Sequence, residues 1–188
     1  MKFSSKIFIK FKSQLIQNID NVSEKQIENL FNLIKKIKKK KRKILIFGNG
    51  AGQSVANHFA VDITKNAKIK SLVFTDGNHL TCYANDYGFE NWIVKTIENY
   101  YNRGDLVILI SASGKSKNIV NAAKYCILKK KLFFSLSGFG SKTPLRKLSY
   151  RNIFVDSKSF NIVEILHLYI LIQIVDLFKG KIEYSNKF

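Results

Sequence analysis

Apolar residues follow two alternating patterns along most of the chain, short unbroken runs and longer stretches with helical spacing. The runs have the length of β-strands, and an unbroken apolar run is typical of a strand covered on both faces of a parallel sheet. Strands that alternate with helices predict an α/β fold with right-handed crossovers. We expect strands at 43–47, 69–75, 105–111, 131–137 and 151–155, and helices at 53–65, 79–84, 89–102, 116–129, 145–148 and 161–179.

The first forty residues lie outside this alternation and show only helical spacing. The pattern breaks near 21–23, where Ser23 can cap a second helix with Gln26 three residues further on. Such a helix pair can bury little by itself, so we expect it to pack on another subunit. The predicted organisation is an N-terminal helical pair for oligomerisation at 1–40, a main domain at 41–180 and a tail at 181–188.

The chain is strongly basic, with a formal net charge of +19 over 188 residues. Of its 32 basic residues only four are arginines, and arginine is the side chain that reads bases and grips phosphates bidentately. We therefore expect no nucleic-acid partner. An anionic sugar phosphate as ligand, or a cell interior that tolerates basic proteins, explains the charge more simply. The lysine run at 35–43 could be a polyanion patch, but a solvated helix end that favours cations is the preferred interpretation.

Nothing in the sequence predicts export or a membrane anchor. The longest apolar runs are strand-length, short of the roughly 20 residues that cross a bilayer, and the basic N-terminus lacks the apolar core of a signal peptide. Cys82 and Cys126 form no CxxC motif and have apolar neighbours. We expect buried, reduced thiols in a cytoplasmic protein.

Three polar stretches fall where the expected strands and helices end. Ligands of parallel α/β folds collect at the carboxyl ends of strands. The stretch 48–52 is glycine-rich, and a phosphate cradle and a plain tight turn explain it about equally well. The stretch 111–116 holds three serines and a glycine before a helix, where free N–H groups favour a phosphate. Helix capping by Ser113 or Ser116 would need one serine rather than three, so a phosphate site is preferred. The stretch 85–89 reads as a turn between two helices and could be a simple Asx turn.

The order of these motifs resembles the sugar isomerase (SIS) domain family. The segments are GNG…HF…D, TD-x-x-x-LT-x-x-ANDYGFE, S-x-SG-x-S-x-N and VE-x-x-H-L, and the likeness runs from about Lys43 to Phe178. Within the family the sequence is most similar to the phosphoheptose isomerases. The resemblance implies a three-layer fold with a five-stranded parallel sheet, and a homotetramer with active sites between subunits. It also implies isomerisation of sedoheptulose 7-phosphate to a heptose 7-phosphate, with zinc as a possible cofactor and no nucleotide.

The resemblance assigns roles to individual residues, four of which lie on two expected helices. Asp62 matches the catalytic base, and His58, one helical turn before it, matches its partner and zinc ligand. Glu164 matches a residue that can join the metal, so the implied zinc ligands are His58, Asp62 and Glu164. The implied substrate-binding residues are Asn49, Gly50, Gly52, Asp86, Ser111, Ser113 and Ser116.

Three positions depart from the family pattern. Ala51 and Gly52 stand where the family has Gly-Ser, and Asp62 stands for a glutamate. Ile172 occupies the position of a second catalytic histidine. His167 could complete a rearranged metal site with His58, Asp62 and Glu164, but a core histidine with a satisfied hydrogen bond is preferred. We expect His79 to be a structural or surface residue.

These departures keep a second function open, that of a non-catalytic protein that binds a phosphosugar or regulates through it. An adaptor that associates with a replication initiator belongs to the same alternative, since such a protein shares the fold.

Overall fold

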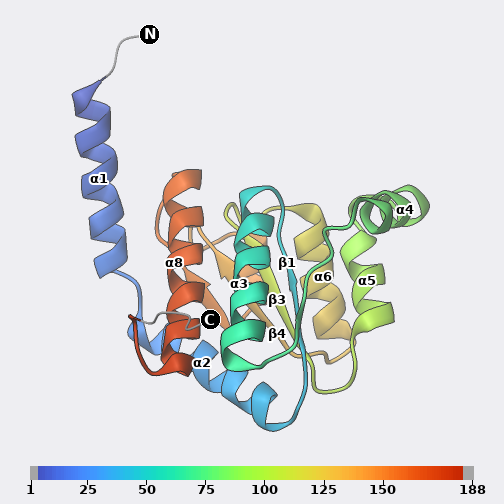
Figure 1. The fold of residues 1–188 in the computed structure, drawn as a ribbon. Coiled ribbons are helices and arrows are strands. Elements are labelled where there is room, and N and C mark those ends of the chain that lie inside the picture. The colour runs from blue at the N-terminus through green and yellow to red at the C-terminus, as the bar shows by residue number, and fades with distance from the viewer. Residues whose placement is uncertain (1–3, 184–188) are drawn as a thin grey trace.

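The computed structural model describes residues 4–183 of the chain. Its five strands form one parallel sheet in the order β2-β1-β3-β4-β5, with helices on both faces (Figure 1). The sheet and its three layers confirm the predicted fold class. The strands are β1 (Ile44–Phe47), β2 (Ser71–Leu72), β3 (Leu106–Ser111), β4 (Phe133–Ser137) and β5 (Asn152–Phe154).

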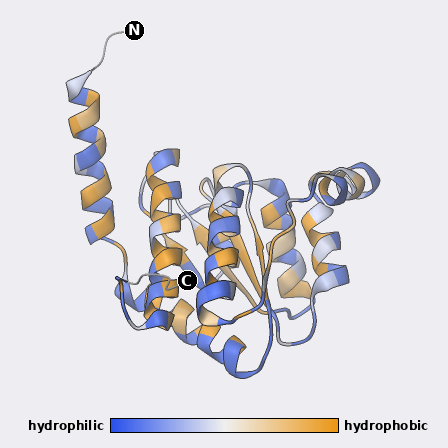
Figure 2. Ribbon diagram, viewed as in Figure 1, coloured by the Kyte–Doolittle hydropathy of each residue, from blue (hydrophilic) through white to orange (hydrophobic). Residues whose placement is uncertain are grey.

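Two hydrophobic cores cover the two faces of the sheet. Successive side chains of a strand point to opposite faces, so Ile108 of β3 packs into one core and Leu109 into the other. The unbroken orange of the central strands in Figure 2 reflects this double burial. The helices are α1 (Ser5–Asp20), α2 (Glu24–Lys39), α3 (Ala51–Ala67), α4 (Gly77–Tyr87), α5 (Trp92–Tyr100), α6 (Lys117–Leu128), α7 (Pro144–Leu148) and α8 (Phe160–Lys179).

All expected elements are present, and the largest differences from the predicted limits are those of β2 and α4. The strand expected at 69–75 is reduced to the two residues of β2, because this edge strand pairs with β1 only at Ser71 and Leu72. The turn expected at 85–89 begins later, because Asn85, Asp86 and Tyr87 still belong to α4 and the chain turns at Gly88. The Ser23 cap is confirmed, since its hydroxyl accepts a hydrogen bond from the Gln26 N–H.

None of the residues of α1 is buried, which is otherwise true only of α4 among the helices of residues 4–183. α1 projects from the body of the molecule and approaches α8 near its C-terminal end (Figure 1). Its apolar side chains include Ile7, which is 71% exposed, and Ile16, which is 49% exposed. The apolar face of α1 is therefore covered only in small part by the rest of the same chain.

α8 is long and apolar enough to span a membrane by length and composition alone. Its buried face, which includes Leu166 and Ile170, packs in the core against α3. A core helix of a globular protein has the same composition, so this feature is weak support for a membrane span.

The two thiols have different surroundings. Cys126 is buried in α6 as predicted, and burial raises the pKa of its thiol to about 12. The same prediction is wrong for Cys82, which is exposed on α4. Its Sγ lies 3.6 Å from a carboxylate oxygen of Asp86, which raises the pKa of the thiol. Both cysteines are free, as expected.

Candidate active site at the carboxyl edge of the sheet

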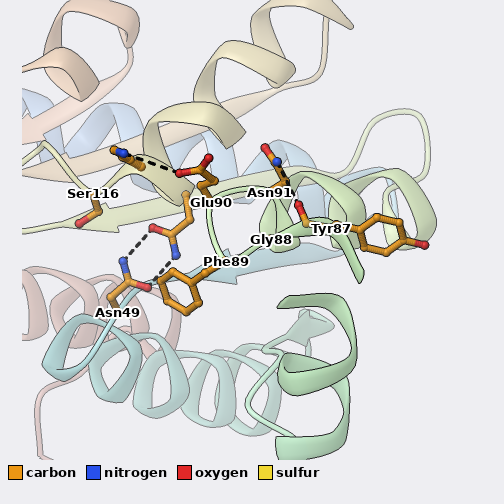
Figure 3. Close-up of a pocket in the computed structure, with 9 residues that line it drawn as sticks. Asn49, Tyr87, Gly88, Phe89, Glu90, Asn91 and Ser116 are labelled. Atoms are coloured by element: carbon orange, nitrogen blue, oxygen red, sulfur yellow. Dashed lines mark hydrogen bonds and ion pairs between the residues drawn. The ribbon is translucent and has the colours of Figure 1, made fainter. Parts of the chain in front are cut away.

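The loops that follow β1 and β3 lie side by side, because these strands pair in parallel with Phe47 opposite Leu109. Two amide hydrogen bonds join the loops. Asn49 Nδ2 donates to Asn118 Oδ1 at 3.0 Å, and Asn118 Nδ2 donates to Asn49 Oδ1 at 2.9 Å (Figure 3). Asn118 is 2% exposed, so this reciprocal pair is shielded from water on one side. The β1 turn and the start of α6 are therefore fixed to one another.

Glycine is required at two positions of the turn after β1. A Cβ atom on Gly48 would lie 2.4 Å from the backbone carbon of Gly52, and Gly50 has a φ of +52°. α3 starts directly afterwards, two residues earlier than predicted. The Gly48 N–H donates to Gln53 Oε1 at 3.2 Å, so it is already occupied. The turn needs its glycines for its own conformation, whether or not it also binds a ligand.

The serine loop, residues 111–116, connects the end of β3 to α6. Ser111 is buried, and its Oγ lies 3.1 Å from Ser116 Oγ. Ser116 is the N-cap residue of α6, yet its side chain makes no capping hydrogen bond. The Ser113 hydroxyl accepts from the Lys115 N–H at 3.3 Å rather than from the helix. Helix capping therefore does not explain these serines. Of the first three N–H groups of α6, that of Ile119 donates to Asn118 Oδ1 at 3.0 Å, and the other two have no carbonyl partner within the helix.

The serine loop forms one wall of a cavity of about 140 Å³ at this edge of the sheet. A second cavity of about 420 Å³ shares Asn49 and Ser116 with the first (Figure 3). The Phe89 ring lies on its wall near Asn49, whereas the Tyr87 ring points away. The smaller cavity is lined by Asn49, Gly52, Ile110, Ser111, Ala112, Ser113, Ser116, Phe160 and Glu164. The larger is lined by Asn49, Tyr87, Gly88, Phe89, Glu90, Asn91, Ser116, Lys117 and Asn118.

The side chains of His58 and Asp62 are in contact on the face of α3 where the sequence places both. His58 Nε2 lies 3.1 Å from Asp62 Oδ2, and the side chains are 52% and 30% exposed. His58 lines a third cavity of about 380 Å³ together with Glu164 of α8. Glu164 also lines the serine-loop cavity, so it stands between the pair and the serines. Partial burial raises the pKa of the Glu164 carboxyl.

The structure does not assemble the implied zinc ligands. Within residues 4–183 no three His, Cys, Asp or Glu side chains are grouped so that they could hold a metal ion. His58 and Asp62 are in contact and Glu164 lies near them, but the three side chains of one chain do not converge as metal ligands would.

Asp86, a predicted substrate-binding residue, and Ile172, at the position of the expected second histidine, lie away from the serine loop. Asp86 is exposed on α4, where it accepts a hydrogen bond from Asn85. Ile172 lines a groove between α2 and α8, together with Ile27 and Phe31. One chain therefore brings neither residue to the serines.

His167 is fully buried, and neither of its ring nitrogens makes a hydrogen bond of ordinary geometry to the described residues, although the Ser137 backbone is near enough to interact with the ring. The expected core position of His167 is confirmed, but its polar neighbour, the Ser137 backbone, forms no hydrogen bond of ordinary geometry with the ring. The described residues do not form the rearranged metal site. Burial lowers the pKa of His167 to about 4. His79 has the structural role expected of it, because its Nε2 lies 2.9 Å from Thr96 Oγ1 and its ring stacks on Tyr83.

Sequence reasoning missed two residues of the site, Gln53 and Asn118. Both hold the β1 turn by hydrogen bonds. The signal for Asn118 was present as the last letter of the S-x-SG-x-S-x-N segment, but its partner is 69 residues away.

A small pocket with three serines thus lies at the carboxyl edge of a parallel sheet, near a histidine and a carboxylate. Residues 8–130 match the family model described as SIS domain. The chain belongs to the SIS domain family.

Curated relatives agree with this membership, and a solved structure has the same fold. A phosphoheptose isomerase of Campylobacter jejuni is 35% identical over 143 residues, which cover 71% of this chain and 76% of the relative. The phosphoheptose isomerase of Fusobacterium nucleatum is 39% identical over 88 residues, and the match spans less than half of each protein, 44% and 45%. The solved structure of a phosphoheptose isomerase from Francisella tularensis has the same fold, with a TM-score of 0.85, 24% identity and coverage of 96% and 100%.

Proposed function

We propose that this chain is an aldose–ketose isomerase that converts sedoheptulose 7-phosphate to a heptose 7-phosphate. The observation that carries the proposal is the serine loop, whose side chains bond one another instead of capping α6. A phosphate there would meet hydroxyls and the positive end of a helix. The names of the relatives support phosphoheptose as the sugar.

The larger cavity suits the rest of the sugar. It shares Asn49 and Ser116 with the serine-loop cavity. The carbon chain of a sugar whose phosphate is held by the serines would therefore extend into this space. A fixed phosphate restricts the position of the reacting carbons, which is how a binding group accelerates a reaction at a distance.

The reaction moves a proton between two neighbouring carbons. Asp62 is the proposed base, and the contact of its carboxylate with His58 Nε2 at 3.1 Å holds it in place. Glu164, whose raised pKa keeps its proton to a higher pH than an exposed glutamate, is placed to donate to a sugar oxygen. No step of this scheme passes through a metal.

We infer that a complete site needs a second copy of the chain. His58 and Asp62 are partly exposed on α3, and α1 has an uncovered apolar face. The family resemblance suggests a homotetramer. A zinc ion would need ligands from that second copy. Free thiols support a location in the cytoplasm.

The activity is tested by incubating the purified protein with sedoheptulose 7-phosphate and following the aldose signals by NMR. We expect turnover, and at least a 100-fold loss of turnover in Asp62→Asn with substrate binding retained. Zinc content is measured on the same samples. An absence of turnover with and without added zinc would contradict the catalytic proposal.

The alternative is a phosphosugar-binding protein without catalysis. Ile172 favours it, because this residue replaces the expected histidine and faces the α2–α8 groove. This function predicts that phosphosugars raise the melting temperature of the protein and that Ser113→Ala abolishes the shift, with no product in the NMR assay. Turnover by the unaltered protein would exclude it.

A further inference from the structure

The amino edge of the sheet, opposite the candidate active site, is strongly basic. All five parallel strands begin there, each after a connection from a preceding helix, and we call the four connections before β1, β2, β3 and β4, at 40–43, 68–70, 101–105 and 129–132, the lysine edge. Ten of their sixteen residues are lysine or arginine, whereas the other 172 residues of the chain share twenty-two. A general bias of composition toward lysine would not concentrate the charge in this way.

The strand order places the four connections next to one another. The Ile44 N–H donates to the Lys70 carbonyl, and the Leu106 N–H to that of Lys43, so the starts of β2, β1 and β3 are neighbours. The Val107 N–H likewise donates to the Leu132 carbonyl at the start of β4. Neighbouring strands lie about 4.8 Å apart, so the edge presents its charges along a row of about 15 Å. In Figure 1 the connection from α2 to β1 runs along the lower side of the molecule.

Negative charge is almost entirely missing from this surface. The one acidic residue of the lysine edge, Asp105, is 1% exposed and pairs with Lys43. The exposed cations of the edge include Lys41, Lys68 and Lys130, and they make no ion pair among the described residues.

Three of these lysines have an unusual backbone conformation. Lys41, Lys68 and Lys130 have φ values of 52°, 57° and 50°, in the left-handed region where a helix C-terminus usually has glycine. A side chain there costs roughly 1–2 kcal/mol. A cation near a helix C-terminus recovers only about 0.3–1 kcal/mol. Interaction with the helix dipoles therefore does not account for lysine at all three ends.

We propose that the lysine edge binds the sugar-phosphate backbone of nucleic acid without preference for sequence. Scarce arginine argues against reading of bases, but lysines neutralise backbone phosphates well. A row of about 15 Å matches roughly four base pairs of duplex, whose phosphates follow every 3.4 Å along each strand. An anionic membrane is the weaker fit, because only the last connection has exposed apolar neighbours, Ile127 and Leu128. The active site faces the other way, so both ligands can bind together.

The test compares two triple variants of the full chain, each lacking three positive charges. The edge variant is Lys41→Asn, Lys68→Asn and Lys130→Asn, and asparagine tolerates the left-handed conformation. The control is Lys12→Asn, Lys142→Asn and Lys158→Asn, three exposed lysines elsewhere. Binding to fluorescent 20-base-pair DNA duplexes of two unrelated sequences is measured by anisotropy between 50 and 300 mM salt, and folding is checked by thermal melting.

We expect the unaltered protein to bind both duplexes equally. The edge variant should bind at least about tenfold more weakly, with a salt dependence of log K shallower by about 2–3, while the control changes affinity less than about threefold. Equal losses in both variants would overturn the proposal, as would unchanged binding by the edge variant. Binding to phosphatidylserine vesicles but not to duplex would also overturn it.

Discussion

The buried imidazole of His167 couples stability to pH at the scale of one residue. Its pKa is about 4 in the folded chain and about 6.5 when unfolded, so between these values the unfolded chain binds more protons. Stability should fall as the pH drops below 6.5, by about 2 kcal/mol at pH 5 and by about 3 kcal/mol below pH 4. Urea unfolding at pH 7, 6 and 5 measures this loss.

The control for that prediction is His167→Leu, which replaces the titratable imidazole with an apolar side chain of similar size. This variant should lose less stability between pH 7 and pH 5 than the unaltered protein does. Parallel curves for the two proteins would show that other groups dominate the pH dependence.

Some residues of the candidate site could be predicted from the sequence and others could not. Ser111, Ser113 and Ser116 were predictable because three hydroxyls within six residues exceed what a helix cap needs. Asn118 was not, because its function depends on Asn49, which becomes its neighbour only when β1 and β3 pair. Pairings of this kind are nonlocal, and a sequence pattern read in short windows does not contain them.

At the scale of an element, the turn between β1 and α3 has no room for a side chain. Gly48→Ala would place a Cβ within 2.4–2.7 Å of backbone atoms of Gly52 and Gln53, which cannot move without disrupting α3. We expect a loss of at least about 2–3 kcal/mol of stability, or no folded protein.

Gly77→Ala is the matched control, because a Cβ at that position of α4 meets nothing within 4 Å. This variant should be as stable as the unaltered protein or about 0.5–1 kcal/mol more stable. Thermal or urea unfolding of both variants compares them. Similar stability of the two would mean that the turn can rearrange.

Helices and central strands were the most predictable elements. β3 and β4 have apolar runs long enough to specify buried strands, and Ser23 marked the start of α2. The short β2 was not predictable, because its length is set by where it pairs with β1 rather than by its own residues. The limits of α4 were missed because residues typical of turns, Asn85 and Asp86, lie in its last turn.

At the scale of the whole molecule, the uncovered face of α1 predicts association. Ile7→Lys with Ile16→Lys should leave the fold of one chain intact, because neither side chain is buried. We expect the mass in solution, measured by light scattering, to fall toward that of a monomer of 21.6 kDa. The control Lys6→Gln with Lys12→Gln alters exposed residues of the same helix and should keep the assembly.

Turnover measured on the same samples connects assembly with function. If the site needs a second copy of the chain, the double variant of Ile7 and Ile16 should lose its activity when it dissociates into monomers. Full activity in a monomer would contradict the inference that subunits share the site.

The paired amides of Asn49 and Asn118 have a consequence for ligand binding. Two loops that are already held to one another do not have to be ordered when a ligand arrives, so little conformational entropy is lost at that step. Their hydrogen bonds also leave the cavity shape defined in the empty protein. Recognition at this end of the cavity should then resemble a rigid fit, with selectivity between phosphosugars decided by shape rather than by loop closure.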